Sequence, residues 1–97
     1  MSPLDVLDKV EQLMHEHGWQ RTSLQHCMLG RAYEAVGAQF GHMRETSNPT
    51  LHKALNAVRE HLGAYRLSLW NSESTRTFEE VLAALAGGRA LLRKQAT

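Results

Sequence analysis

Six histidines and a single cysteine are the side chains of this 97-residue chain that could bind a metal ion or attack a substrate. His15 and His17 are two positions apart, so on a helix they point in different directions. His52 and His61 are nine positions apart, close to opposite sides of one helix. No His-Glu-x-x-His or zinc-finger spacing occurs, so metal ligands would have to come from separate helices. We therefore predict no metal site and no cofactor, with surface or capping roles for the histidines.

Cys27 could act as a nucleophile only with a base in reach and a positive surrounding that favours the thiolate. The adjacent His26 diverges from it by about 100° on a helix, so a histidine from another segment would have to serve. We interpret Cys27 as a small core residue beside Met28, because free cysteine is commonly buried. No glycine-rich phosphate loop, paired-acid pattern or catalytic triad is present, so we predict no catalytic residues and no enzyme.

Four segments have the apolar spacing of amphipathic helices that would position these side chains. We expect them at residues 3–17, 23–36, 49–62 and from 78 onward. The first and third each open with a capping side chain before proline, in Ser2-Pro3 and Asn48-Pro49, and each stops at a glycine. In the second, Leu24, Met28 and Ala32 share one face. We predict an all-α fold, a compact four-helix domain covering residues 1–97.

Two tryptophan-containing turns connect these helices. Within the ambiguous segment 64–70, Arg66-Leu67-Ser68-Leu69 alternates like a strand, but no partner strand is evident, so we expect an extended or single-turn segment. Trp19 and Trp70 lie at element boundaries, where each ring can pack on the core while its N–H bonds a backbone carbonyl. We expect the Asn71 side chain to close its own turn.

The last helix has a clear start and a weak middle. Thr77 and Glu80 form a capping box, since each side chain can accept from the other's backbone N–H. Just before it, Arg76 and Glu73 are placed to form an exposed ion pair.

Two adjacent glycines, Gly87-Gly88, then cost helix stability. We expect residues 89–97 to kink, fray or continue onto a partner. In that tail, Leu91 and Leu92 could supply a docking or dimer patch.

The composition of the chain limits the classes of partner to be expected. Hydrophobic residues make up 42% of the chain and charged residues 22%, with a net charge of +1, whereas a small nucleic-acid binder usually has a denser or more lopsided basic content. No apolar run approaches the roughly 20 residues that cross a bilayer. The start Met1-Ser2-Pro3-Leu4-Asp5 lacks the features of a secretory signal, and one cysteine cannot form an internal disulfide. We expect a cytoplasmic protein with no membrane contact.

Four short motifs carry a resemblance. They are His17-Gly18-Trp19, Cys27-Met28-Leu29-Gly30-Arg31-Ala32, Trp70-Asn71 and Arg76-Thr77-Phe78-Glu79-Glu80-Val81. In this combination, over residues 5–86, the chain resembles a family of short uncharacterised helical proteins from actinobacteria and their phages. Members have a Gly-Trp turn, a Cys-x-x-Gly-Ala-like helix and a Trp-Asn-Asp turn leading into Thr-x-x-Glu-Val. Here Ser72 replaces the Asp, and Gln20-Arg21-Thr22 replaces a Gln-Gly-like pair. The resemblance implies a helical fold and an actinobacterial or phage source, but no reaction.

These observations favour a binding role over catalysis. We expect a small protein-interaction or regulatory module, encoded by a phage and acting on a host protein. We expect its partner contacts at Trp70, Asn71, Arg76, Leu91 and Leu92. Homodimerisation is a further expectation.

A DNA-binding regulator is the alternative. Its third helix would contact nucleic acid through Lys53, Asn56 and Arg59. Against this, residues 37–48 are far longer than the turn of about 3–4 residues in a helix-turn-helix motif, and Glu60 lies close by. An enzyme or metal protein centred on Cys27 and a histidine is the third interpretation.

Overall fold

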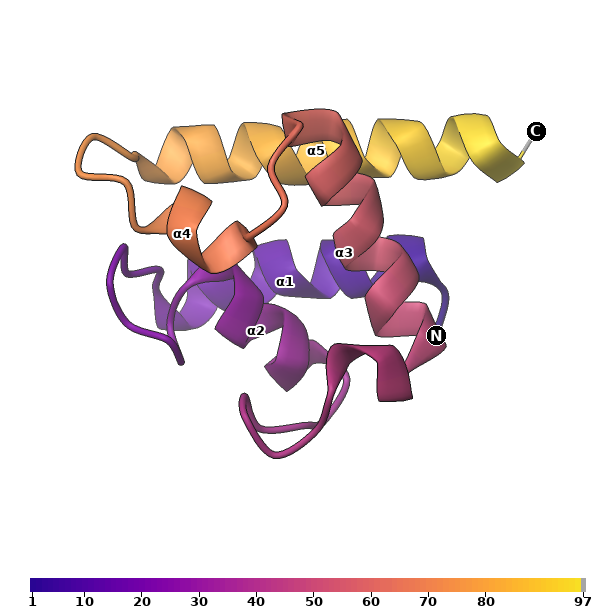
Figure 1. Ribbon diagram of the computed structural model, residues 1–97, viewed down its shortest axis with the longest axis horizontal. Helices are drawn as coiled ribbons and strands as arrows, with labels where there is room; N and C mark the ends of the chain where they lie inside the picture. The colour runs from indigo at the N-terminus through magenta and orange to yellow at the C-terminus, as the bar shows by residue number, and fades with distance from the viewer. Residues whose placement is uncertain (97) are drawn as a thin grey trace.

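Helices form nearly all the regular structure in the computed structural model of this chain, which describes residues 1–96 (Figure 1). In chain order they are α1 (Pro3–His17), α2 (Met28–Ala35), the 3-10 helix η1 (Glu45–Ser47), α3 (Pro49–Leu62), α4 (Leu67–Asn71) and α5 (Phe78–Ala96). Within residues 1–96 the only strand-like feature is an isolated bridge between Phe40 and Met43. The all-α prediction is confirmed, with four longer helices and two short ones between them.

Capping side chains set the ends of α1 and α3 as the sequence predicts. Ser2 Oγ accepts a hydrogen bond from the Asp5 N–H (3.2 Å), and the Asp5 carboxylate accepts one from the Ser2 N–H (2.9 Å). Asn48 Oδ1 accepts from the Leu51 N–H (3.0 Å), and Gly63 ends α3 in the left-handed region at φ 64°. Both helices therefore have the predicted bounds.

α2 begins later than the predicted start at residue 23. The chain turns there instead, with the Cys27 N–H donating to the Ser23 carbonyl oxygen (2.9 Å). Cys27 then caps the helix, because its Sγ accepts from the Gly30 N–H (3.4 Å). Gly30 lies against the Leu24 carbonyl oxygen, where a Cβ would have no room. Local bonds to serine and cysteine side chains thus replace the first helical turn, and Leu24, expected on the inner face, is exposed.

The segment that alternates like a strand forms the short helix α4, as the single-turn alternative predicts. The Ser72 N–H closes the turn on the Ser68 carbonyl oxygen (3.1 Å). Leu67 is buried, whereas Leu69 points to solvent. α4 lies beside α2 (Figure 1).

α5 runs unbroken through the two glycines, so residues 89–96 neither kink nor fray. A Cβ on Gly88 would lie 2.7 Å from Val58 Cγ2 of α3, so the missing side chain lets the two helices approach closely. Helix packing outweighs the intrinsic cost of glycine here. Thr97, the last residue of the predicted tail, lies outside the described residues.

The core lies between α1, α3 and α5, with α2 packed against α1 (Figure 1). Its largest fully buried side chains include Leu7, Met14, Met28, Leu51, Leu55 and Leu85. Both tryptophans pack against this core, as predicted, and Trp19 stacks on Phe78 with 6.0 Å between ring centroids. Among the helices of residues 1–96, none has the length and apolar character needed to cross a membrane.

Candidate functional site

Asn71 fixes α4 in place through four hydrogen bonds to distant parts of the chain. Its Oδ1 accepts from Trp19 Nε1 (2.7 Å) and from the Met28 N–H (3.2 Å). Its Nδ2 donates to the carbonyl oxygens of Gln20 (3.3 Å) and Arg21 (2.9 Å). The side chain is fully buried, so every polar atom of its amide has a partner. These bonds hold the end of α4 against the start of α2 and the loop that precedes it.

Two predictions are corrected by this arrangement. Asn71 has no exposed surface, so it is an internal connector and not a partner contact. The Trp19 N–H bonds a side-chain oxygen and not the predicted backbone carbonyl. Both corrections come from pairing across the whole chain, which no local pattern indicates.

Arg76 and Trp70 are also occupied within the protein. The Arg76 guanidinium lies 3.8 Å above the centroid of the Trp70 ring, and its Nε donates to the Trp70 carbonyl oxygen (2.9 Å). Arg76 pairs with Glu80 (2.9 Å) and not with Glu73 as predicted. A backbone hydrogen bond from Thr77, and then the Arg76 pair, hold the pKa of the Glu80 carboxyl below its ordinary value despite some desolvation. The side chains of Trp70 and Arg76 are half-buried and stabilise the turn between α4 and α5.

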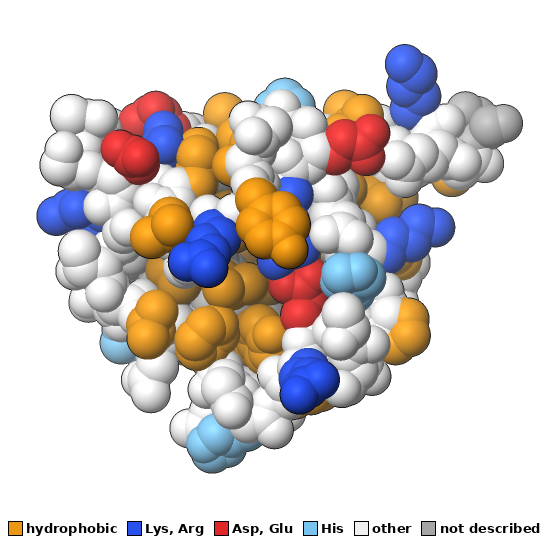
Figure 2. All heavy atoms as spheres, viewed as in Figure 1, with side chains coloured by type: hydrophobic (Ala, Val, Ile, Leu, Met, Phe, Trp, Pro, Cys, Tyr) orange, Lys and Arg blue, Asp and Glu red, His pale blue; other side chains and the backbone are white. Residues whose placement is uncertain are grey.

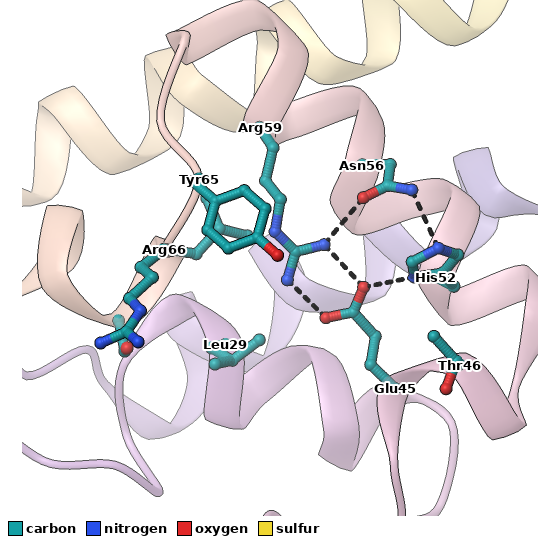
Figure 3. A pocket seen from close by; sticks show the side chains of 10 residues that line it. Leu29, Glu45, Thr46, His52, Asn56, Arg59, Tyr65 and Arg66 are labelled. Carbon is teal, nitrogen blue, oxygen red and sulfur yellow. Dashed lines mark hydrogen bonds and ion pairs between the residues drawn. The ribbon is translucent and has the colours of Figure 1, made fainter.

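A network around Glu45 joins η1 to α3 (Figure 3). The Glu45 carboxylate accepts from both terminal nitrogens of Arg59, one at 2.6 Å, and lies 2.7 Å from His52 Nδ1. Burial alone would raise the Glu45 pKa, but the hydrogen bonds from Arg59 and His52 outweigh it, so the pKa lies below its ordinary value. The same bond to Glu45 raises the pKa of Arg59. Asn56 extends the network to Arg59 (2.9 Å) and His52 (3.0 Å).

This network changes the residues assigned to the DNA-binding alternative. Lys53 and Asn56 are exposed on α3, but the charge of Arg59 is balanced by Glu45. Phosphate binding depends on cations that are free to replace counterions. The structure therefore places Lys53, Asn56 and Arg59 on one helix, α3, but the ion pair with Glu45 neutralises the charge of Arg59.

A cleft of about 480 Å³ opens beside the network, between α2, η1, α3 and α4. Its lining residues are Leu29, Glu45, Thr46, His52, Asn56, Arg59, Tyr65, Arg66, Leu67 and Ser68. Figure 3 shows Tyr65 on the side of Arg59, whereas Arg66 points away from the Glu45 network, with Leu29 between. The cleft is thus lined by the apolar side chains of Leu29 and Leu67, by the neutralised Glu45–Arg59 pair and by Arg66, which has no ion pair within residues 1–96.

A smaller hollow of about 170 Å³ continues this surface along α4, and Ser68 lines both. Three large hydrophobic side chains around the two hollows point to solvent: Tyr65 is 88% exposed, Leu69 58% and Leu24 57%. Figure 2 shows hydrophobic side chains gathered over α2 and α4, with basic side chains among them. We call the surface formed by Leu24, Leu29, Tyr65, Arg66 and Leu69 the α4 face. The sequence does not single it out, because Leu24 and Leu29 belong to the predicted second helix, and Tyr65, Arg66 and Leu69 to the strand-like segment.

Comparison with known proteins places the chain in a family. The model of a family of unknown function (DUF6197) matches residues 1–90. The chain belongs to this family. It matches no curated protein and no solved structure. The predicted membership of an uncharacterised family is therefore confirmed, and the whole α4 face lies inside the DUF6197 region.

Leu91 and Leu92 lie beyond the DUF6197 region, and they do not form the predicted docking patch. Leu92 is only 5% exposed and belongs to the core, and Leu91 is partly buried against it. Because α5 continues without a break past Gly87-Gly88, both leucines pack toward the core.

Cys27 is a capping residue at the buried start of α2, and not a residue within that helix as predicted. It is 3% exposed, and its Sγ also donates to the Leu24 carbonyl oxygen (3.4 Å). The neighbouring His26 Nδ1 lies 3.0 Å from Ser23 Oγ. Within residues 1–96, no group of three His, Cys, Asp or Glu side chains is arranged to hold a metal ion.

Proposed function

We propose that this DUF6197 protein is a protein-interaction module, with a regulatory role, that docks a partner protein on the α4 face. The supporting observation is the contiguous exposure of Leu24, Tyr65 and Leu69 around an open cleft. Apolar patches of this kind mark interaction sites, because a partner that covers an exposed leucine gains the favourable free energy of burying its apolar surface. An exposed aromatic side chain such as Tyr65 is also a common energetic anchor of an interface.

The proposal includes the setting expected from the sequence. A cytoplasmic protein of an actinobacterium or its phage, acting on a host protein, agrees with the single unpaired cysteine and with the motif resemblance. Trp70 and Arg76 hold the end of α4 through their mutual contact and so support the shape of the face. Direct contact of these two residues with the partner stays a prediction.

Affinity capture with matched variants tests this proposal. Tagged wild-type protein, the double variant Leu24→Ser/Leu69→Ser and the control Ala83→Ser/Ala86→Ser on the exposed side of α5 are incubated with nuclease-treated actinobacterial lysate. We expect a near-stoichiometric protein on the wild type and the control that is lost from the Leu24/Leu69 variant. Circular dichroism checks that all three proteins are folded. Identical retained proteins on all three, or loss of all retained material after nuclease, would contradict the proposal.

A further inference from the structure

Among the described residues, two arginines of the α4 face and its rim form no ion pair with a carboxylate. Arg31, Arg59, Arg76 and Arg89 are each paired with a glutamate. Within residues 1–96, Arg66 forms no ion pair, and Arg21 makes only a hydrogen bond to the Ser72 carbonyl oxygen (2.6 Å). Both line the hollows beside α4. Their charges are therefore available to a ligand on this surface.

These two arginines flank α4 at its opposite ends. Arg66 precedes the first helical residue, and Arg21 is tied to Ser72, which follows the last one. The rise of about 1.5 Å per helical residue places these two ends roughly 9 Å apart. Leu69 lies between them and is exposed. The surface is thus an apolar anchor site with a guanidinium on each side.

The acidic lining of the two hollows does not oppose these charges. In the part of the chain that the structure describes, Glu45 is the only acidic residue that lines either hollow, and Arg59 and His52 already occupy its oxygens. Arg66 and Arg21 therefore leave an excess of positive charge beside the α4 face, and a complementary ligand carries negative charge.

We propose that the occupant of the α4 face is a segment of a partner protein in which a large apolar side chain is flanked by acidic residues. This inference rests on the proposed docking function. The apolar side chain covers Leu24, Leu29 and Leu69, and the flanking carboxylates bind the forked guanidinium groups of Arg66 and Arg21. A phosphate backbone also satisfies arginines, but it offers nothing to cover the exposed leucines at the centre.

Selection from a displayed library of random peptides of about 12 residues, long enough to cross the face when extended, tests the inference. The baits are wild type, Arg66→Glu and the matched control Arg93→Glu at the exposed end of α5. We expect the wild type and the control to enrich peptides with acidic residues around a Leu, Ile, Phe, Met or Trp. Fluorescence anisotropy with a selected synthetic peptide should show at least about tenfold weaker binding to Arg66→Glu. Binding to Arg93→Glu should be unchanged, and high salt should weaken wild-type binding.

Each other result has a defined meaning. Selected peptides without acidic excess that bind Arg66→Glu equally well overturn the inference but leave docking intact. Peptides that bind the Leu24→Ser/Leu69→Ser variant as tightly as wild type contradict the proposed function itself. A dimer in sedimentation that Leu69→Ser dissociates makes a second copy the occupant. Failure to enrich any peptide, or Arg66-dependent binding of a labelled DNA duplex instead, also overturns the inference.

Discussion

Replacing Asn71 by alanine should strongly destabilise the protein. The change leaves the Trp19 indole N–H, the Met28 N–H and two loop carbonyl oxygens without their partner in a fully buried position. An unsatisfied buried polar group costs about 1–3 kcal/mol, so we expect a loss of roughly 2–4 kcal/mol in the free energy of unfolding. Urea denaturation followed by circular dichroism measures it.

Ser74→Ala is the matched control for Asn71→Ala, because Ser74 is exposed in the turn after α4. It should change the free energy of unfolding by less than about 0.5 kcal/mol. Equal effects of the two substitutions would mean that the Asn71 network does not hold α4 in place.

Glu45 should make stability depend on pH in the acid range. Its pKa is lowered in the folded protein, so the folded state binds this proton less readily than the unfolded state. The resulting stabilisation is present above the ordinary glutamate pKa of about 4.3 and is lost as the pH falls through the lower folded value. Glu45→Gln should therefore lower the free energy of unfolding by about 1–3 kcal/mol at neutral pH.

The difference between wild type and Glu45→Gln should shrink steadily in urea titrations below about pH 4. Glu60→Gln, at an exposed position of α3, is the control and should leave neutral-pH stability almost unchanged. A difference that stays constant between neutral and acid pH would rule out Glu45 ionisation as its cause.

Which side chains can be predicted from the sequence depends on how far apart the partners lie. The caps at Ser2, Asn48 and Thr77 are predicted because each joins residues three positions apart. Asn71 joins residues about 50 positions away, so its burial depends on the complete fold. The exchange of Glu73 for Glu80 as the partner of Arg76 has a different, local origin, since the helix start places Glu80, four positions on, in reach of Arg76.

Gly87 and Gly88 of α5 should respond to alanine in opposite ways. A Cβ on Gly88 would press on Val58 Cγ2 and lie 3.3 Å from the Val58 backbone nitrogen, which cannot move aside. We expect Gly88→Ala to cost about 1–3 kcal/mol. The three atoms nearest to a Cβ on Gly87 all belong to the exposed His61 ring, whose far end can rotate away.

Gly87→Ala should therefore be neutral or stabilise by up to about 1 kcal/mol, the helix propensity gained over glycine. Thermal unfolding of both variants measures the contrast. A similar loss of stability in both variants would mean that the close packing of α5 is not restricted to Gly88.

At the level of helices, boundaries that end on a strong local signal are predicted correctly, as for α1 and α3. The start of α2 is wrong because Ser23 and Cys27 use their own side chains and carbonyls to form a turn where the apolar spacing continues. The expected break at Gly87-Gly88 is wrong because close packing on α3 favours glycine there. The first error thus comes from local hydrogen bonds that compete with the helix, and the second from a tertiary contact that outweighs helix propensity.

The α4 face could not have been predicted from the sequence, because it exists only in the assembled molecule. Leu24 comes from the turn before α2, whereas Tyr65 and Leu69 come from the segment around α4. The Asn71 bonds bring these two distant segments together. A stretch of leucines spaced as a helix stripe does not reveal which of them remain in water.

Truncation distinguishes two interpretations of the C-terminal half of α5, as a structural part of the fold or as a docking tail. Residues beyond Gly87 contribute the buried Gly88 and Leu92, and Arg89, which pairs with Glu11 of α1 (2.8 Å). A chain that ends at Gly87 loses these contacts and exposes apolar surface of α1 and α3, so we expect its stability to fall by more than about 3 kcal/mol or its cooperative unfolding to disappear. A chain that ends at Arg93 should stay within about 1 kcal/mol of wild type, because the residues it lacks up to Ala96 are exposed. Thermal unfolding followed by circular dichroism compares the two, and an unchanged transition in the shorter chain would restore the docking-tail interpretation.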